Sequence, residues 1–357
     1  MNVEPEKWDR ARLVLEAHAA RKTMPGAVGL VVRREGIVAQ WAVGKHTYDP
    51  LSASVKPNDI FDLASVTKAA VTTTLCAAFV DAGALDLDLP VHHYVPAFSG
   101  GAKNRVTARH LLAHCGGLPA HVHLYKNSSG RDAIMSQVYA MELACAPGSE
   151  TAYSDMGFLL LGGLLEHISG LRLDRLADKV VFDPLKMVDA GYCPGADRRF
   201  RILPTEVKTN LREGLVWGEV HDENAAAMGG IAAHAGLFAS ADDLARFLRM
   251  WLCGGILDGT RVLSRRVVDL FTRRANLVPN SSWALGWDTV SPGVSSSGRY
   301  FSPESFGSLG FTGTSLWADP ERDLGVVLLT NRVHPTRENL QIKELRPAFH
   351  DAVSEAI

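Results

Sequence analysis

The sequence predicts an α/β (α+β) fold in which an antiparallel sheet is flanked by the N- and C-terminal helices and carries an inserted, mostly helical domain. Two β-rich runs follow a helical pattern at the N-terminal end, and strand-like runs return before a last helical pattern. The simplest packing pairs both ends of the chain in one sheet. We therefore expect a sheet domain of residues 1–60 and 281–357, a helical domain of residues 61–280, and a pocket in the crevice between them.

The N-terminal end carries the first helix and the first hairpin of this scheme. Residues Glu6–Arg21 form an amphipathic pattern whose apolar stripe contains Trp8, Ala11, Leu15 and Ala19. The runs Ala27–Val32 and Ile37–Val43 are rich in β-branched residues, and Arg33-Arg34-Glu35-Gly36 separates them. This arrangement predicts a β-hairpin.

The stretch Phe61–Gly83 predicts a buried helix with two reactive side chains at its head. Its residues from Ala69 to Val80 are all apolar or small, and Gly83 ends the pattern. Ser65-Val66-Thr67-Lys68 fits S-x-x-K, in which the two side chains fall on one face of a helix. A free serine hydroxyl is a poor nucleophile, and a neighbouring amine can take its proton. The pattern also arises by chance, as a serine near a helix start with a lysine that reaches solvent.

Further helical patterns follow within the inserted domain. Val106–His114 predicts a short helix, and Gly157–Ile168 predicts a second helix that is apolar on all sides. Ser240-Ala241-Asp242-Asp243 is a capping sequence for a helix that ends at Gly254-Gly255. Residues 183–220 are proline-rich and polar, and we expect them to form long surface connections.

Several polar side chains of this domain have more than one interpretation. Tyr153 precedes the second buried helix, where it is either a packing residue or a proton-transfer group. His110 and His114 are four residues apart, a spacing that can bind a metal ion, but no H-E-x-x-H and no suitably spaced carboxylate accompanies them. We expect structural histidines there and no metal. His221 and His234 lie in a glycine- and alanine-rich stretch that we expect to line the crevice, and we assign them no role.

The C-terminal end returns to strand patterns. The runs Trp283–Asp288, Leu316–Asp319 and Gly325–Asn331 predict strands, and Pro320–Asp323 predicts a tight turn between the last two. A helical stripe of apolar residues then closes the chain, with Leu345, Phe349 and Val353 as its members.

Composition excludes several classes of function. The chain has 357 residues, of which 46% are hydrophobic, and a formal net charge of −2 with no basic run. Nucleic acid and anionic membrane surfaces are therefore not expected as partners. The five cysteines are an odd number without C-x-x-C spacing, which indicates neither a disulfide framework nor a zinc site. We expect no cofactor. The charged N-terminal segment lacks a signal-peptide pattern and no apolar run is long enough to span a membrane, so we expect a cytoplasmic protein.

Three motifs in order resemble a known family. Ser65-Val66-Thr67-Lys68, Tyr153-Ser154-Asp155 and Ser308-Leu309-Gly310 are similar to the motifs of serine hydrolases related to class C β-lactamases. That family also contains penicillin-binding DD-peptidases and family VIII carboxylesterases. Connecting stretches share the likeness, which covers the chain from about Pro25 to Asn331. The resemblance implies the β-lactamase/transpeptidase-like form of the fold described above.

The resemblance also implies roles for single residues. Ser65 would be the nucleophile that accepts the acyl group, and Lys68 would lower its proton affinity. Tyr153 would carry the proton to the leaving group. A lysine among apolar side chains can have a lowered pKa, so either Lys68 or Tyr153 can be the base. The backbone N–H groups of Ser65 and Phe311 would form the oxyanion hole.

Two motifs depart from the family pattern at residues expected to bind substrate. The second motif often ends in asparagine, but here it ends in Asp155, which can bind Lys68 and keep it charged. The third motif usually begins with lysine or histidine followed by a hydroxyl residue, but here it is Ser308-Leu309-Gly310. An alternative register, Phe311-Thr312-Gly313, restores the hydroxyl but not the cation. A contact of that kind with a substrate carboxylate contributes about 1.5–3 kcal/mol.

A neutral ester does not need the missing cation. We therefore expect a hydrolase of family VIII carboxylesterase type that cleaves small, short-chain neutral esters through an acyl-serine intermediate. The alternatives are a β-lactamase or D-amino-acid peptidase, and a non-catalytic member of the fold that serves as a binding or sensor domain. The oligomeric state is left open.

Overall fold

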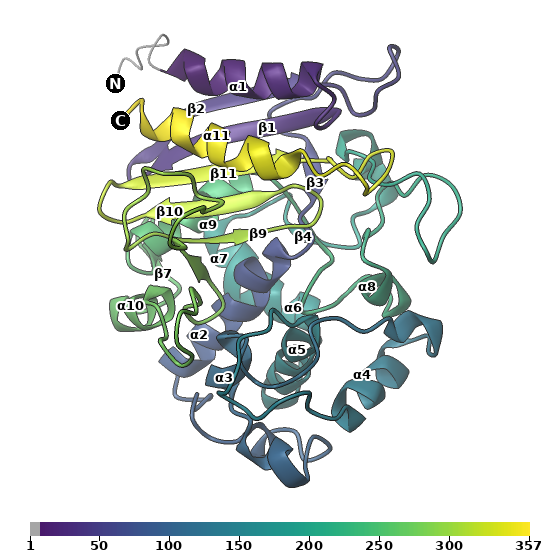
Figure 1. The fold of residues 1–357 in the computed structure, drawn as a ribbon, viewed down its shortest axis with the longest axis vertical. Helices are drawn as coiled ribbons and strands as arrows, with labels where there is room; N and C mark the ends of the chain where they lie inside the picture. Colours follow the sequence, from purple (N-terminus) through teal and green to yellow (C-terminus); the bar gives the residue numbers. More distant parts are fainter. Residues whose placement is uncertain (1–7) are drawn as a thin grey trace.

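The core of the protein is a six-stranded antiparallel sheet built from both ends of the chain. The computed structural model describes residues 8–357, and its strands run in the order β2-β1-β11-β10-β9-β8 (Figure 1). This confirms the predicted fold class. The strand bounds are Gly26–Arg33 (β1), Gly36–Gly44 (β2), Asp288–Thr289 (β8), Phe306–Leu309 (β9), Ser315–Asp319 (β10) and Leu324–Thr330 (β11).

The pairing of β1 with β11 joins the two ends of the chain. Leu30 of β1 lies opposite Val327 of β11, and both side chains are fully buried. Strands β1 and β2 form the predicted hairpin, with a register shift between Val31 and Val32. The central strands are apolar on both faces because helices cover both sides of the sheet.

One face of the sheet is covered by α1 (Asp9–Ala20) and α11 (Ile342–Ser354), which lie side by side at the top of Figure 1. Both predicted terminal helices are confirmed, although the part of the first prediction before Trp8 falls outside the described residues. Gly29 of β1 allows the close approach, since an added Cβ would lie 2.7 Å from Phe349 and 2.8 Å from Leu15. On the opposite face, α9 (Ala241–Leu252) packs against β1 and β11.

The segment between β2 and β8 forms the helical part of the molecule, in the lower half of Figure 1. Its remaining α-helices are Thr74–Asp81 (α2), Ala108–Leu112 (α3), Arg131–Ala140 (α4), Asp155–Ser169 (α5), Leu173–Ala177 (α6), Asp183–Leu185 (α7), Glu223–Ala227 (α8) and Arg265–Thr272 (α10). Short 3₁₀ turns occur at Val91–His93, Gly101–Arg105, Leu124–Lys126 and Ala196–Arg201, and π-helical segments at Lys68–Thr73 and Asp178–Phe182. Small strands are Ile60–Asp62 (β3), Gly191–Tyr192 (β4), Leu237–Ser240 (β5), Ile256–Leu257 (β6) and Thr260–Arg261 (β7).

The structure corrects two local predictions. Residues Trp283–Asp288 do not form a strand, because the chain turns tightly at Gly286 (φ +78°) and only Asp288–Thr289 pairs with β9. Residues 183–220 are not only surface connections. Within them the side chain of Glu206 is buried, and it forms hydrogen bonds with His221 and with the guanidinium of Arg337. The domain limits proposed from the sequence stay a prediction.

The apolar helices of the molecule are short or bent. Within residues 8–357 no single helix has the length and apolar composition of a membrane span, although the bent pair Asp155–Ser169 and Leu173–Leu185 meets those two criteria jointly. Helix α5 passes through the core of the protein, with ten of its residues buried, from Met156 to Leu165.

Replacement of Phe349 by alanine tests the packing of the terminal helices on the sheet. The side chain is fully buried against α1 and β1, so we expect Phe349→Ala to lower the free energy of unfolding by about 3–5 kcal/mol. The matched control is Leu13→Ala on the exposed face of α1, where 54% of the residue is accessible and the change should stay within about 0.5 kcal/mol. Urea denaturation measures both, and equal effects would contradict this packing.

Candidate active site

A strained turn presents Ser65 between β3 and the first helical segment. Ala64 adopts a left-handed conformation (φ +47°), which is unfavourable for a residue with a Cβ. The buried carboxylate of Asp62 holds this turn, because it accepts hydrogen bonds from the N–H of Ala64 at 2.8 Å and from the N–H of His221 at 2.6 Å. The strain is therefore localised one residue before the predicted nucleophile.

The helix that follows Ser65 differs from the regular α-helix that the sequence predicts. Residues Lys68–Thr73 are π-helical, and only Thr74–Asp81 form an α-helix. The hydroxyl of Thr74 bonds to the carbonyl of Ala69, and that of Thr72 bonds to the carbonyl of Ala233 in the glycine- and alanine-rich stretch. Such π-helical turns are frequent at functional sites. Here the turn lies directly at the predicted catalytic lysine.

Lys68 is the centre of the polar contacts in the site. Its ammonium Nζ lies 2.9 Å from Ser65 Oγ, 2.7 Å from Asp155 Oδ1 and 3.3 Å from the carbonyl of His234. It also stands over the ring of Tyr153, 4.7 Å from the ring centre. The structure thus brings together the predicted residues of the first and second motifs.

The ion pair with Asp155 decides the charge of Lys68. Burial alone would lower the pKa of Lys68, but the charge of Asp155 and the neighbouring Tyr153 more than offset this, and its pKa is raised. Burial alone would raise the pKa of Asp155, yet Lys68 and His121 hold it well below its usual range. The sequence leaves open whether Lys68 or Tyr153 is the base. The structure favours a charged ammonium on Lys68 over a neutral amine.

The second motif forms the start of α5. Ser154 caps this helix by accepting a hydrogen bond from the N–H of Gly157, and it donates to the carbonyl of Pro119 at 2.7 Å. The N–H of Ser154 in turn bonds to Nδ1 of His114. Burial and the charge of Lys68 lower the pKa of His114 to about 3, so this histidine is neutral. Its ring contacts that of Tyr153, with ring centres 4.6 Å apart.

The predicted oxyanion hole lies where the loop after β9 meets the loop after β3. Thr312 Oγ1 donates to the carbonyl of Asp62 at 2.8 Å, and Thr314 Oγ1 donates to that of Leu63 at 3.0 Å. These bonds hold the loop of Phe311 against the segment that precedes Ser65. Within residues 8–357 neither the N–H of Ser65 nor that of Phe311 donates to another protein atom. Both donors remain available for a substrate oxygen.

The third motif lies at the end of a strand. Ser308 and Leu309 are the last residues of β9, and together with Gly310 they line the cavity beside Ser65. The alternative register is not supported, because Thr312 is buried and bonded to the nucleophile loop. All of the predicted site residues except Asp155 line this cavity, and Asp155 contacts it through Lys68.

The cavity has a volume of about 510 Å³ and lies between the two parts of the chain. Its remaining walls come from the segment before β8 and from the start of α11, and they include the side chains of Trp283, Leu340 and Ile342. Three cations that the sequence reading missed also line it, namely Arg332, Lys343 and Arg346. No motif signals them, since Arg332 follows β11 and the place of Lys343 and Arg346 depends on how α11 packs against the sheet.

Two of these cations support the loop after β9. Arg332 donates through Nε to the carbonyl of Phe311 at 2.8 Å, and Arg346 donates to the carbonyls of Gly310 and Thr314. Burial lowers the pKa of Arg346 to about 9, so the guanidinium remains charged near neutral pH. Lys343 is exposed, and none of the ion pairs within residues 8–357 involves it. The loop of the oxyanion hole therefore rests on two buried arginines.

Three histidines outside the motifs, His110, His221 and His234, support neighbouring groups and do not line the cavity, whereas His114 does. His221 binds Glu206 at 2.9 Å and stacks on the ring of Phe311, and His234 binds Asp222 at 2.9 Å. His110 belongs to the N-terminal cap of α3. Within residues 8–357 no group of three or more histidine, cysteine, aspartate or glutamate side chains is arranged to hold a metal ion.

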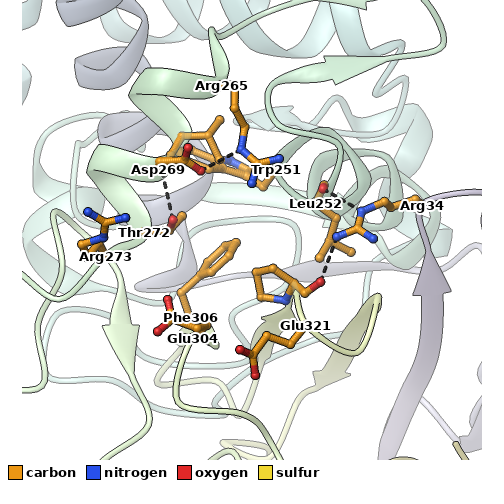
Figure 2. Close-up of a pocket in the computed structure, with 12 residues that line it drawn as sticks. Arg34, Trp251, Leu252, Arg265, Asp269, Thr272, Arg273, Glu304, Phe306 and Glu321 are labelled. Carbon is orange, nitrogen blue, oxygen red and sulfur yellow. Dashed lines mark hydrogen bonds and ion pairs between the residues drawn. The ribbon is translucent and has the colours of Figure 1, made fainter.

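Figure 2 shows a second hollow, of about 370 Å³, which contains none of these residues. It is lined by side chains of both charges around Trp251 and Phe306, and its Arg265 and Asp269 form an ion pair at 2.7 Å. Arg34 on its other side bonds to the carbonyl of Leu252. Arg265 and Arg34 are therefore already bound by other groups of the protein. We assign the candidate reaction site to the cavity beside Ser65.

Comparison with known proteins agrees with this geometry. The β-lactamase family model matches residues 11–348. An N-acetylmuramyl-L-alanine amidase of Bacillus subtilis (strain 168) is 32% identical over 347 residues, which cover 87% of this chain and 78% of that protein. A putative D-alanyl-D-alanine carboxypeptidase of Salmonella heidelberg (strain SL476) is 31% identical over 350 residues, with 88% and 80% covered.

Solved structures share the fold at lower identity. A penicillin-binding protein homologue from Caulobacter crescentus superposes with a TM-score of 0.80 at 21% identity, covering 100% of this chain and 99% of that one. EstCE1, a hydrolase with promiscuous acyltransferase activity, gives a TM-score of 0.79 at 18% identity, with 97% and 98% covered. The extent of the family match and the identity of the full-length relatives establish that the chain belongs to the β-lactamase family and is a serine hydrolase.

Proposed function

We propose that the protein hydrolyses small, short-chain neutral esters through an acyl-enzyme on Ser65. The observation that carries the proposal is the contact of Ser65 Oγ with the ammonium of Lys68 at 2.9 Å, at the wall of a cavity large enough for a small substrate. Both backbone donors of the predicted oxyanion hole are free to receive a carbonyl oxygen.

In the first step Ser65 Oγ attacks the ester carbonyl carbon, and the carbonyl oxygen becomes an oxyanion at the N–H groups of Ser65 and Phe311. The proton of the Ser65 hydroxyl passes to the leaving alcohol as the ester C–O bond breaks. Tyr153, whose ring lies beneath Lys68, is the residue we assign to carry that proton. Water then attacks the acyl-serine, which releases the acid and restores the hydroxyl.

The charge of Lys68 fits an electrostatic role. An ammonium 2.9 Å from Ser65 Oγ stabilises the developing alkoxide, so the serine needs a weaker base to lose its proton. Asp155 keeps that charge in place. In this mechanism the lysine orients and stabilises, while the proton moves through Tyr153.

The walls of the cavity support neutral esters as substrates. They include the side chains of Tyr153, Trp283, Leu309 and Phe311, and the third motif contributes no cation. An apolar acyl or alcohol group gains by leaving water against such side chains.

A second candidate is cleavage of an amide whose leaving group has a free carboxylate. Lys343 lines the same cavity and is exposed, so it can meet a substrate anion. The relatives at 31–32% identity are named as an amidase and a putative carboxypeptidase, and both names describe enzymes that cleave amide bonds. This candidate replaces the absent cation of the third motif by a lysine from α11.

The nucleophile assignment is tested by Ser65→Ala with p-nitrophenyl butyrate and with the chromogenic cephalosporin nitrocefin. We expect ester turnover to fall by at least about a thousandfold, because the attacking oxygen is lost. Ser129→Ala, a change of an exposed serine, is the control and should keep full activity. If Ser65→Ala kept most of the wild-type rate, Ser65 would not be the nucleophile. Faster turnover of nitrocefin than of the ester would favour a β-lactamase.

The two substrate classes are separated by phenyl butyrate and 3-carboxyphenyl butyrate, which differ only in a carboxylate on the leaving alcohol. We expect phenyl butyrate to be cleaved at least as fast, and Lys343→Ala to change neither rate by more than the control Lys56→Ala. If the carboxylated ester is preferred and Lys343→Ala lowers its kcat/KM by about two- to five-fold, Lys343 recognises a carboxylate on the leaving group, which contradicts the preference for neutral esters and favours the second candidate.

The ion pair is tested by the pH dependence of kcat/KM in Asp155→Asn. Asp155 raises the pKa of Lys68, so its loss lets Lys68 give up its proton at lower pH. We expect the alkaline ionisation in the profile to move to lower pH by about one unit or more. The same alkaline ionisation in Asp155→Asn and in the wild type would show that Asp155 does not hold the charge of Lys68.

A further inference from the structure

We propose that His121 is a positioning residue: it binds the free oxygen of Asp155 and thereby sets how tightly that carboxylate holds Lys68, so that the two cations titrate in competition. The coupling itself is a property of these three side chains. Only its effect on rate rests on the proposed function.

The geometry of Asp155 carries the proposal. Its Oδ1 lies 2.7 Å from Lys68 Nζ and its Oδ2 lies 2.9 Å from Nδ1 of His121. A carboxylate only accepts hydrogen bonds, so Nδ1 of His121 carries the proton of this contact. Nε2 is therefore the atom at which the imidazole gains or loses its charge.

The backbone fixes this contact. The N–H of Asp155 donates to the carbonyl of Ala120 at 2.8 Å, and Ser154 Oγ donates to the carbonyl of Pro119 at 2.7 Å. The segment before His121 is thus attached to the first turn of α5. The position of His121 beside Asp155 is therefore set by the backbone contacts of its segment.

The three side chains form a path from solvent to the buried lysine. The side chain of His121 is 40% exposed, that of Asp155 is 15% exposed and that of Lys68 is 3% exposed. Solution pH therefore acts on His121 directly, and it reaches Lys68 through the carboxylate between them.

The charges around His121 favour its protonated form. The hydrogen bond that His121 donates to Asp155 is the main cause of the raised pKa of His121, with further contributions from the charges of Asp155, Asp222 and Glu223. The other titratable groups that face it are His123, whose ring centre is 5.0 Å away, Tyr125 behind His123, and Lys68 across Asp155.

Competition for one carboxylate sets the direction of the effect. A protonated His121 draws part of the charge of Asp155 away from Lys68, which lowers the pKa of Lys68. A neutral His121 still donates through Nδ1, but it leaves more of that charge on Lys68. Such coupling is reciprocal, so loss of the Lys68 ammonium must raise the pKa of His121. A neutral amide at position 155 has no charge to divide and would not couple the two.

The coupling is measured without any activity assay, by NMR titration of the Cε1–H of His121. Its signal is assigned as the one lost in His121→Asn. We expect Asp155→Asn to lower the pKa of His121 by about one unit or more, and Lys68→Met to raise it. The same pKa in the wild type and in both variants would overturn the proposal. Two variants are used so that one poorly folded protein does not leave the question open.

The effect on the site is measured as the pH profile of kcat/KM for p-nitrophenyl butyrate. His121→Ala removes the Nδ1–H donor and leaves the whole charge of Asp155 on Lys68, so the alkaline ionisation should move to higher pH, while kcat/KM at neutral pH, where Lys68 is charged in both proteins, should stay close to the wild-type value. His121→Asn can still donate to Asp155 and should return the alkaline ionisation towards its wild-type position. His123→Asn is the control for the segment and should match the wild type.

A wild-type profile in His121→Ala would overturn the positioning role. Absence of Ser65-dependent turnover in the wild type would instead overturn the proposed function, and the NMR titration would still decide on the coupling.

Discussion

The ion pair between Lys68 and Asp155 is the constraint on which the rest of the site depends. Removal of two charges from water costs several kcal/mol for each ion, and only good geometry with further hydrogen bonds offsets that cost. The structure supplies both, through a 2.7 Å contact and additional bonds to Ser65, the His234 carbonyl and His121. Because the pair connects the π-helical turn to α5, the proposed nucleophile Ser65 and the second motif are held as one unit.

The sheet completes the site by a different kind of contact. Backbone carbonyls of the loop after β9 accept bonds from the buried guanidinium groups of Arg332 and Arg346, while threonine hydroxyls of the same loop donate to the nucleophile turn. The donors of the proposed oxyanion hole are thereby positioned by groups from the segment after the last strand and from the last helix. This explains why residues far apart in sequence must fold together before the reaction site exists.

Most of the fold and the three motifs could be predicted from the sequence, because periodicity and turn residues are local signals. Phe349 and Leu345 mark the last helix, and Ser65 with Lys68 marks the first motif. The π-helical turn, the cations of α11 and the contact of His121 with Asp155 could not, since each depends on how distant segments pack. The charge of Lys68 followed only from its distance to Asp155 in the folded structure, because apolar neighbours alone indicate a lowered pKa.

The measurement that tests the central claim most directly is the site of covalent modification by a fluorophosphonate, mapped by peptide mass spectrometry on the active enzyme. We expect a single adduct on the peptide that contains Ser65, formed in step with the loss of ester turnover. An adduct on another residue that abolishes activity, or a fully active enzyme with Ser65 completely labelled, would contradict it.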